Sequence, residues 1–466
     1  MVTASLPLLP PVVDQSITHT PLTALSAVAF ALAGLAALWL SLRRPQWAAA
    51  LLAFSIPFAF YRDVLGTTVT LEKVVIIGVA IGLVMRGAPL VPAGTAARRI
   101  LIASLVVLAA IALSGIGATY AGPVLREALK QLEYIVMFWC AASLIVEQRD
   151  DARWLEAGLI SGVFVVAVDA IAQGLVGGAP SGVWINGHRL PRVAGPLEGP
   201  NQLAGFLEIS LPVLLLSPLL FGERLRVPRW IALFAVALAI PMTLSRSGVA
   251  FALFAFVLVW FVDRAAARRS WLPFAAGTVA GFAIAFQWYW GATHSFALLG
   301  DIFRLSEVPL QDPGGVGTRN ELWSAALTMF AAHPLLGVGA GNFEHLLGSV
   351  GLVNVQTHAN SLWLQTLAEQ GLVGFVALLA LYVVVLRECS VGLASSWLAR
   401  AALIATLCML LHQVVDDLFF FPKVGLLWWL LVGAAAGDLA GARAPAPAPV
   451  APSPTAELAE TATPIA

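Results

Sequence analysis

The chain is poor in charged residues and cysteine, and it has no recognisable internal repeat. Charged residues make up 11% of the 466 residues and hydrophobic residues 59%, with a mean hydropathy of +0.87. This balance excludes an ordinary soluble domain, in which about a quarter of residues are charged. The absence of a repeat of about 20–50 residues argues against a solenoid. Two of the three cysteines, Cys140 and Cys408, lie in apolar stretches, so we expect neither a disulfide nor a cysteine-based metal site.

The sequence contains about thirteen long apolar stretches. They are continuously apolar rather than alternating, which favours helices over strands, because backbone exposed to lipid must satisfy its own hydrogen bonds. We therefore predict an all-α, polytopic transmembrane helix bundle of about 12–13 spans. Several stretches are shorter than the roughly 20 residues that cross a bilayer, and the second one is a candidate re-entrant segment. The stretches are 25–42, 46–60, 69–85, 100–116, 129–146, 154–176, 203–221, 230–244, 248–262, 272–290, 371–386, 401–415 and 424–439.

Arginine is dense in every second loop and sparse in the loops between. This alternation is the positive-inside pattern of a multi-span inner-membrane protein, and its parity predicts an N-terminus outside and a C-terminus inside. The first 22 residues contain no Lys or Arg, so we expect no cleaved signal peptide. The arginine-dense loops, together with the C-terminal tail, contain sixteen of the 26 basic residues: Arg43, Arg44, Arg86, Arg98, Arg99, Arg149, Arg153, Arg224, Arg226, Arg229, Arg264, Arg268, Arg269, Arg387, Arg400 and Arg443.

The same reading divides the chain into five parts. The long outer loop is the distinctive one, because loops of this length in a compact protein are usually functional or disordered. The Ala/Pro-rich tail is disordered by composition. The parts are an N-terminal segment 1–24, the first ten spans 25–290, a helical periplasmic loop 291–370, the last three spans 371–440 and a cytoplasmic tail 441–466.

Two helices are expected within the long loop. Thr318 and Glu321 have the spacing of a capping box. The helix that they open carries an apolar face up to Pro334, which predicts an amphipathic helix on or near the membrane surface. A second helix is expected from about Ala359 to Gln370, where Gly371 begins the next span.

Three arginines on the outer side are candidate ligands for an anion. Arg246 lies in a short break between two apolar helices, where the alternative is an interfacial arginine reaching a lipid phosphate. Arg192 precedes a span, and its alternative is a polar turn. Arg319 sits in the first turn of the amphipathic helix, where a cation opposes the helix dipole; an anionic ligand would compensate this, and the alternative is a solvated surface residue.

His358 is the histidine that we single out as a candidate base. It precedes a predicted helix N-terminus, where anions bind well and where we expect a lowered pKa and a neutral ring. The alternative is a structural histidine at a helix start. The glycines of 337–341 resemble a dinucleotide loop but follow no predicted strand. Asp416 and Asp417 are a weak hint of a metal site, and we interpret them as polarity at a span end.

These residues occur in motifs that resemble the O-antigen ligase/polymerase superfamily. The motifs are RNELW from Arg319, HPLLGVGAGNF from His333 and THANSLWLQ from Thr357, followed by EQGLVG from Glu369. The resemblance covers roughly 319–374, and it extends more weakly to LSRS at Arg246 and to Arg192 with Pro200 and Asn201. Many relatives have His-Asn where this chain has Asn360 and Ser361.

The resemblance implies an O-antigen ligase at the periplasmic face of the bacterial inner membrane. The donor would be a polysaccharide on undecaprenyl diphosphate and the acceptor lipid A–core oligosaccharide, without cofactor, metal or nucleic acid. Arg246, Arg319 and Arg192 would hold the diphosphate, and His358 would activate the acceptor hydroxyl. Relatives with twelve spans have both ends inside, unlike our count of thirteen.

Other functions remain open from the sequence. An O-antigen polymerase or a protein O-oligosaccharyltransferase would share this chemistry, with a different acceptor. A lipid-linked glycan transporter would also be an apolar bundle, but translocation pathways usually place ionisable groups in mid-membrane, and most of those here lie near the ends of the predicted spans.

Overall fold

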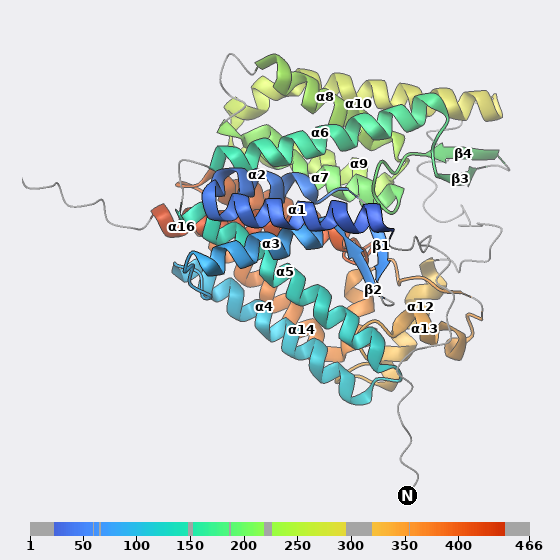
Figure 1. Ribbon diagram of the computed structural model, residues 1–466. Coiled ribbons are helices and arrows are strands. Elements are labelled where there is room, and N and C mark those ends of the chain that lie inside the picture. Colours follow the sequence, from blue (N-terminus) through green and yellow to red (C-terminus); the bar gives the residue numbers. More distant parts are fainter. Residues whose placement is uncertain are drawn as a thin grey trace, which may run out of the picture.

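Long helices crossing the molecule side by side form nearly all of the described structure (Figure 1). The computed structural model describes residues 23–58, 60–64, 67–147, 152–185, 188–218, 226–294, 319–353 and 355–442. Each predicted apolar stretch corresponds to one helix, which confirms the all-α polytopic bundle. The helices are α1 (Ala24–Arg43), α2 (Pro45–Ser55), α3 (Leu71–Met85), α4 (Thr95–Ser114), α5 (Ala121–Glu147), α6 (Ala152–Val176), α7 (Pro200–Leu216), α8 (Arg226–Met242), α9 (Arg246–Val262), α10 (Arg264–Thr293), α14 (Leu362–Val391), α15 (Trp397–His412) and α16 (Pro422–Ala442).

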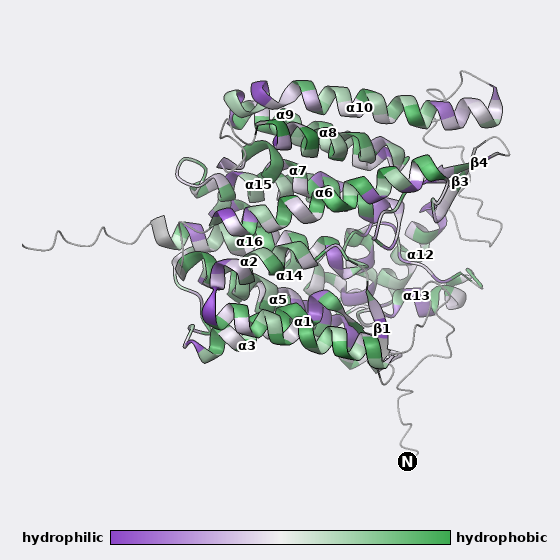
Figure 2. Ribbon diagram, turned by 45° about the horizontal axis from the view of Figure 1, so that its top comes forward, coloured by the Kyte–Doolittle hydropathy of each residue, from purple (hydrophilic) through white to green (hydrophobic). Residues whose placement is uncertain are grey.

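Seven of the described helices are long and apolar enough to cross a membrane: α1, α4, α5, α6, α10, α14 and α16. Helices α7, α8, α9 and α15 are apolar but shorter. Hydrophobic residues extend along the length of the bundle, and hydrophilic ones collect toward its two ends (Figure 2). The chain is therefore a multi-pass membrane protein.

The small elements lie together at one end of the bundle, on the right in Figure 1, which we call the site end. Two antiparallel hairpins stand there, β1–β2 and β3–β4. The elements are β1 (Tyr61–Val64), β2 (Thr67–Thr70), β3 (Ser181–Ile185), β4 (His188–Arg192), α12 (Arg319–Ala332), α13 (Phe343–Leu346) and the short helices η1 (Gly115–Gly117) and η5 (Leu347–Val350).

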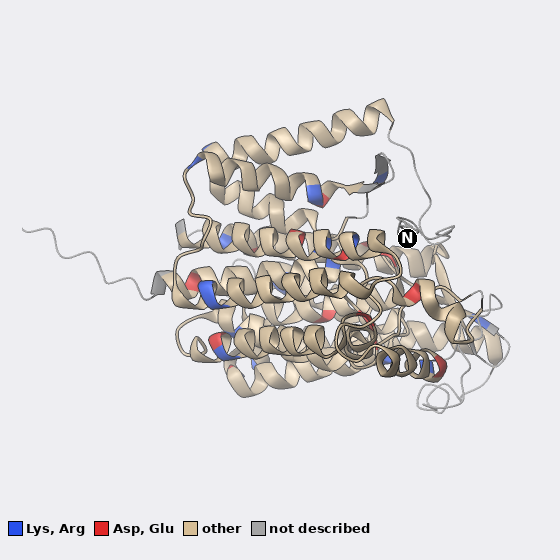
Figure 3. Cartoon of the chain, turned by 90° about the horizontal axis from the view of Figure 1, so that it is seen from below, with Lys and Arg blue, Asp and Glu red and all other residues tan. Residues whose placement is uncertain are grey.

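Arginines of the dense loops lie at the opposite end, which we call the basic end. Arg99 at the start of α4 pairs with Glu388 near the end of α14 at 2.7 Å. Arg400 in α15 pairs with Asp263 at 3.5 Å, between α9 and α10. Figure 3 shows Lys and Arg, with some Asp and Glu, at this end of several helices. The loops that the charge pattern assigned to one side thus meet at one end of the molecule.

The start of the first helix and the end of the last helix lie at opposite ends of the bundle. Helix α1 begins at the site end and α16 finishes at the basic end (Figure 1), as the parity of the charge pattern predicts. Helix α2 has only 11 residues, about 16 Å of rise. It runs parallel to α6, with Gly158 against Ala50 and Gly162 against Phe54. The chain then reaches β1 at the site end, so this segment passes through the bundle and is not re-entrant.

Glycines spaced four residues apart allow several helix pairs to approach closely. In α10, a Cβ on Gly281 would lie 2.4 Å from the carbonyl oxygen of Leu238 in α8, and one on Gly277 would lie 2.4 Å from that of Phe234. In α16, Gly433 and Gly437 pack likewise on the backbone of α5. The hydrophobic effect does not drive helices together in lipid, so helix association there depends on close van der Waals packing, which small residues allow.

Helix α12 belongs to a small second core at the site end. Its apolar residues Leu322, Ala326 and Met329 pack with Phe343 and Leu347. The apolar face that we predicted to lie against the membrane is therefore mostly covered by the protein itself, because α13 and the start of α14 fold back over it. The predicted cap Thr318 lies outside the described residues.

We expect Gly281→Ala to lower the melting temperature of the detergent-purified protein by several degrees. The added methyl group meets backbone of α8, and overpacking of this kind costs about 1–3 kcal/mol. Gly291→Ala in the same helix is the matched control, because a Cβ there meets nothing within 4 Å. Equal melting temperatures for the two variants would contradict this account of the α8–α10 contact.

Candidate active site

His358 and Asp416 form the centre of a polar cluster at the site end. His358 Nε2 lies 3.4 Å from Asp416 Oδ1, and the exposed fractions of the two side chains are 14% and 1%. The imidazole stacks on Phe420 with 4.7 Å between ring centroids. Backbone contacts hold the two loops together, because the N–H of Leu362 donates to the carbonyl oxygens of Gln413 and Asp416. The loop before α14 is thereby fixed on the loop between α15 and α16.

A line of hydrogen bonds connects this pair with Arg192. Asn201 Nδ2 donates to Asp416 Oδ2 at 2.7 Å. The guanidinium of Arg192 donates to Asn201 Oδ1 at 2.7 Å and, through Nε, to the carbonyl oxygen of Thr243 at 2.8 Å. The order Arg192–Asn201–Asp416–His358 therefore joins a predicted anion ligand to the predicted base.

The three predicted arginines interact at this end. Burial, with the charges of Arg319 and Arg246, lowers the pKa of Arg192 to about 10, although Asp416 opposes this shift. Among the described residues, nothing accepts a hydrogen bond from the buried Nε of Arg319. Three guanidinium groups thus share one region in which Asp416 is the carboxylate that acts on Arg192, and an anion would relieve their repulsion.

One small apolar cluster positions the backbone of two of these arginines. Leu190, two residues before Arg192, packs on the fully buried Tyr289 of α10, and Leu244, two residues before Arg246, packs against the same cluster. Ser245 caps α9 by accepting from Gly248 N–H, so Arg246 is the first residue of that helix. The hairpin β3–β4 and the α8–α9 turn therefore depend on a common support.

The glycine-rich segment 337–341 serves as a wedge in a broken helix. Helix α14 is interrupted at Gly371, whose φ is 61° and ψ is −158°. The N–H groups of Val338 and Gly339 donate to the carbonyl oxygens of Ala368 and Glu369, which the break leaves without helical partners. A Cβ on Gly337 would lie 2.2 Å from the carbonyl carbon of Glu369, so the close approach requires glycine. The segment follows α12 rather than a strand, so it is not a dinucleotide loop.

Helix α14 begins at Leu362, after Ser361 as N-cap, and not at Ala359 as predicted. In its first part, Gln365 accepts from the N–H of Ala359 at 2.8 Å and donates to Glu369 Oε1 at 3.3 Å. Glu369 also accepts from the N–H of Phe343. The residue after His358 is therefore held by the broken helix and, through Glu369, by the glycine-rich segment.

The environment of His358 raises its pKa, and the prediction of a lowered pKa is wrong. Burial lowers the pKa of His358, but the hydrogen bond and charge of Asp416 outweigh it. Burial would conversely raise the pKa of Asp416, and His358, His412 and Arg319 lower it to about 2. The reason is tertiary: a carboxylate from a distant loop, and not a helix N-terminus, is the dominant neighbour.

The structure brings His358 and Arg192 into one network and places Arg246 and Arg319 within electrostatic reach of Arg192. Sequence reasoning missed Asp416, which we interpreted as polarity at a span end, and gave no role to Asn201. The only signal for Asn201 was its place in the motif with Pro200. Among the described residues, no group of three or more His, Cys, Asp or Glu side chains is placed to hold a metal ion.

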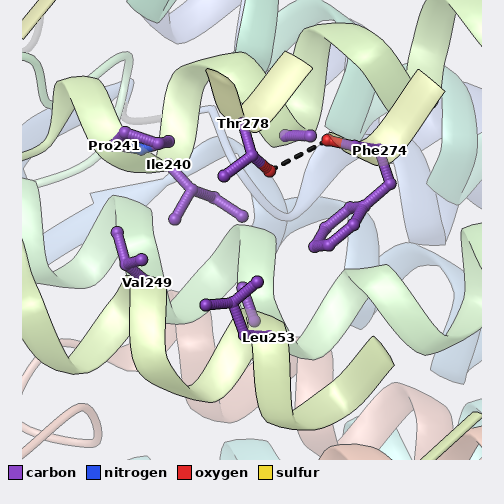
Figure 4. Close-up of a pocket in the computed structure, with 8 residues that line it drawn as sticks. Ile240, Pro241, Val249, Leu253, Phe274 and Thr278 are labelled. Carbon is purple, nitrogen blue, oxygen red and sulfur yellow. Dashed lines mark hydrogen bonds between the residues drawn. The ribbon is translucent and has the colours of Figure 1, made fainter. Parts of the chain in front are cut away.

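An apolar hollow lies between α8, α9 and α10 (Figure 4). Its lining includes Val249, one helical turn after Arg246, and Leu253 one turn further. Pro241 and Phe274 close it from the other helices, and the Thr278 hydroxyl is turned back onto the carbonyl oxygen of Phe274. The hollow is shallow and partly open, and its lining is almost entirely apolar.

We expect Asp416→Asn to lower the pKa of His358. The variant removes the negative charge that favours the imidazolium, so the ring loses its proton at lower pH than in the parent. NMR titration of the His358 ring in the purified protein measures this. Asp417→Asn is the control, because Asp417 acts on His358 more weakly and without a hydrogen bond; an equal shift in both variants would contradict the assignment.

We expect Gly371→Ala to destabilise the protein and misplace His358. The methyl group would lie 2.4 Å from the backbone of Leu335, at a φ of +61°. Gly351→Ala also places a side chain at positive φ (+95°), but in the left-handed region with a ψ of −4°, and the methyl group meets nothing within 4 Å, so it costs only about 1–2 kcal/mol. Denaturant titration compares them; a loss in Gly371→Ala no larger than in Gly351→Ala would refute the role of the wedge.

A family comparison matches part of the chain that contributes to this site. Residues 231–379 match the family model described as O-antigen ligase. The match contains Arg246, Arg319, the glycine-rich segment and His358. No curated protein matches the chain. The match covers 149 of the 466 residues, and together with the motifs and the multi-pass helical bundle it supports the O-antigen ligase superfamily of membrane glycosyl-transfer enzymes.

Proposed function

We propose that the protein is an O-antigen ligase. It transfers a polysaccharide from undecaprenyl diphosphate to lipid A–core oligosaccharide at the periplasmic face of the bacterial inner membrane, without a metal. The observation that carries the proposal is the line Arg192–Asn201–Asp416–His358, which unites a phosphate ligand and a base at one end of an apolar bundle.

Charge supports a diphosphate as the ligand of this end. Arg192, Arg246 and Arg319 repel one another, and the pyrophosphate of a lipid-linked glycan offers two negative phosphates at the membrane boundary. Guanidinium groups bind phosphate oxygens in bidentate fashion. The site end lies opposite the basic end, which the positive-inside rule assigns to the cytoplasm, so the site faces the periplasm.

The contact with Asp416 supports separate roles for the two ring nitrogens of His358. An ionised Asp416 can only accept, so Nε2–H donates to Oδ1. When the ring is neutral, Nδ1 therefore carries the lone pair and takes the proton of the acceptor hydroxyl. The acceptor oxygen forms a bond with the anomeric carbon, and the bond from that carbon to the diphosphate oxygen breaks with its electron pair. The arginines stabilise the charge that develops on the leaving diphosphate.

The apolar hollow supports a lipid donor. It begins one turn below Arg246 and continues along α9, so a headgroup at the arginines would place the first part of an isoprenoid chain against Val249 and Leu253. A nucleotide sugar would have no use for such a surface.

The test is transfer by the purified protein in nanodiscs, with an undecaprenyl-diphosphate-linked glycan and lipid A–core. We expect Arg246→Ala to reduce the rate by about 10- to 100-fold, because an arginine–phosphate contact contributes roughly 1.5–3 kcal/mol. His358→Ala should lower it by about 10²- to 10⁴-fold. Arg189→Ala is the control, since this exposed arginine of β4 lies on Gly182, away from the network.

The acceptor decides between this reaction and its relatives. Glycan attached to lipid A–core supports the ligase. Growth of the lipid-linked glycan without attachment identifies a polymerase, and glycan on protein identifies an oligosaccharyltransferase; either would overturn the ligase. Full activity of the His358 and Arg246 variants would overturn the site.

A further inference from the structure

A second histidine–carboxylate pair lies within the bundle beneath Asp416. His412, the last residue of α15, and Glu208 of α7 are both fully buried, with 2.7 Å between Nδ1 and Oε2. The ring of Phe251 from α9 covers the imidazole at 5.4 Å. Isolated charges are costly at this depth, and ionisable residues inside membrane helices therefore usually mark a functional site.

The two pairs are stacked as successive links between the same two segments of chain. Asn201 and Glu208 are seven residues apart in α7 and so lie on one face of it. His412 and Asp416 are four residues apart, and the N–H of Asp416 donates to the carbonyl oxygen of His412. Asn201 binds Asp416, and Glu208 binds His412 two turns deeper.

We propose that Glu208 and His412 are positioning residues for the transfer reaction: Glu208 keeps His412 protonated, and this buried imidazolium holds Asp416 ionised and restrains the basicity of His358. The inference rests on the proposed function in that it takes His358 as the base. Neither residue touches the substrate; both act through Asp416.

Charge balance explains why such a pair is useful. Asp416 faces His358, His412, Arg319 and the neighbouring Asp417, and His412 faces Glu208, Asp416 and Arg319. A carboxylate that binds His358 alone would retain the proton on the ring, and a protonated ring is no base. A positive charge on the far side of Asp416 partly offsets the negative charge of this carboxylate, so Asp416 stabilises the protonated form of His358 less strongly.

Burying this pair has an energetic cost, which favours a role in positioning Asp416 over a role in stabilising the fold. Buried ion pairs often contribute little to stability compared with apolar residues of similar volume. Among the described residues, no partner is present for the buried Nε2 of His412 or for Oε1 of Glu208. A purely structural pair would be expected to satisfy these atoms.

Glu208→Gln in the nanodisc-embedded protein is the test. Gln retains the size and an acceptor for Nδ1–H but removes the charge, so His412 becomes neutral and His358 becomes more basic. We expect the NMR titration midpoint of the His358 ring to rise by about 0.3–1 pH unit. The acid limb of the transfer rate should move to higher pH by the same amount, and His412→Gln should reproduce both shifts.

Thr406→Val is the matched control. Thr406 is another buried residue of α15, where its hydroxyl accepts from Trp428 Nε1 at 3.0 Å, and its loss should lower stability without moving either midpoint. An unchanged His358 midpoint in a folded Glu208→Gln protein overturns the inference. The ring titration is independent of turnover, so absence of transfer by the parent protein would reject the proposed function and still leave this result decisive.

Discussion

The carboxylate of Asp416 is the interaction on which the site depends. One oxygen binds the imidazole of His358 and the other binds Asn201, which in turn holds Arg192. A buried carboxylate requires such partners, because an unpaired charge inside a protein costs several kcal/mol. The same atoms that make the burial of Asp416 tolerable therefore connect Arg192, the proposed phosphate ligand, with His358, the proposed base.

Rigidity of the surrounding backbone makes this connection useful. The break at Gly371 exposes carbonyl groups within α14, and the segment containing Gly337 and Gly339 satisfies them. Through Gln365 and Glu369 the same break holds the loop that bears His358. The glycine-rich segment thus has a structural role: it supports the kinked helix at the point where its own hydrogen bonds are interrupted.

The bundle has two distinct ends, and the candidate site lies at one of them. At the basic end, arginines pair with acidic residues such as Glu388 and Asp263. At the site end, three arginines act together on one another. Like charges that lie close together raise the local positive potential, which is consistent with the anionic headgroup proposed for the site end.

The sequence by itself determined the helical class, each apolar helix, the separation of the two ends and the candidacy of His358, Arg192, Arg246 and Arg319, because hydropathy and charge patterns are local properties. Only the tertiary structure decided the partner of His358, the direction of its pKa, the deeper Glu208–His412 pair and the packing of α12 onto the protein. These depend on contacts such as His358 with Asp416 across 58 residues and Asn201 with Asp416 across 215. A carboxylate at a span end has the same appearance in the sequence whether it faces water or a histidine, and folding alone settles which neighbour it meets.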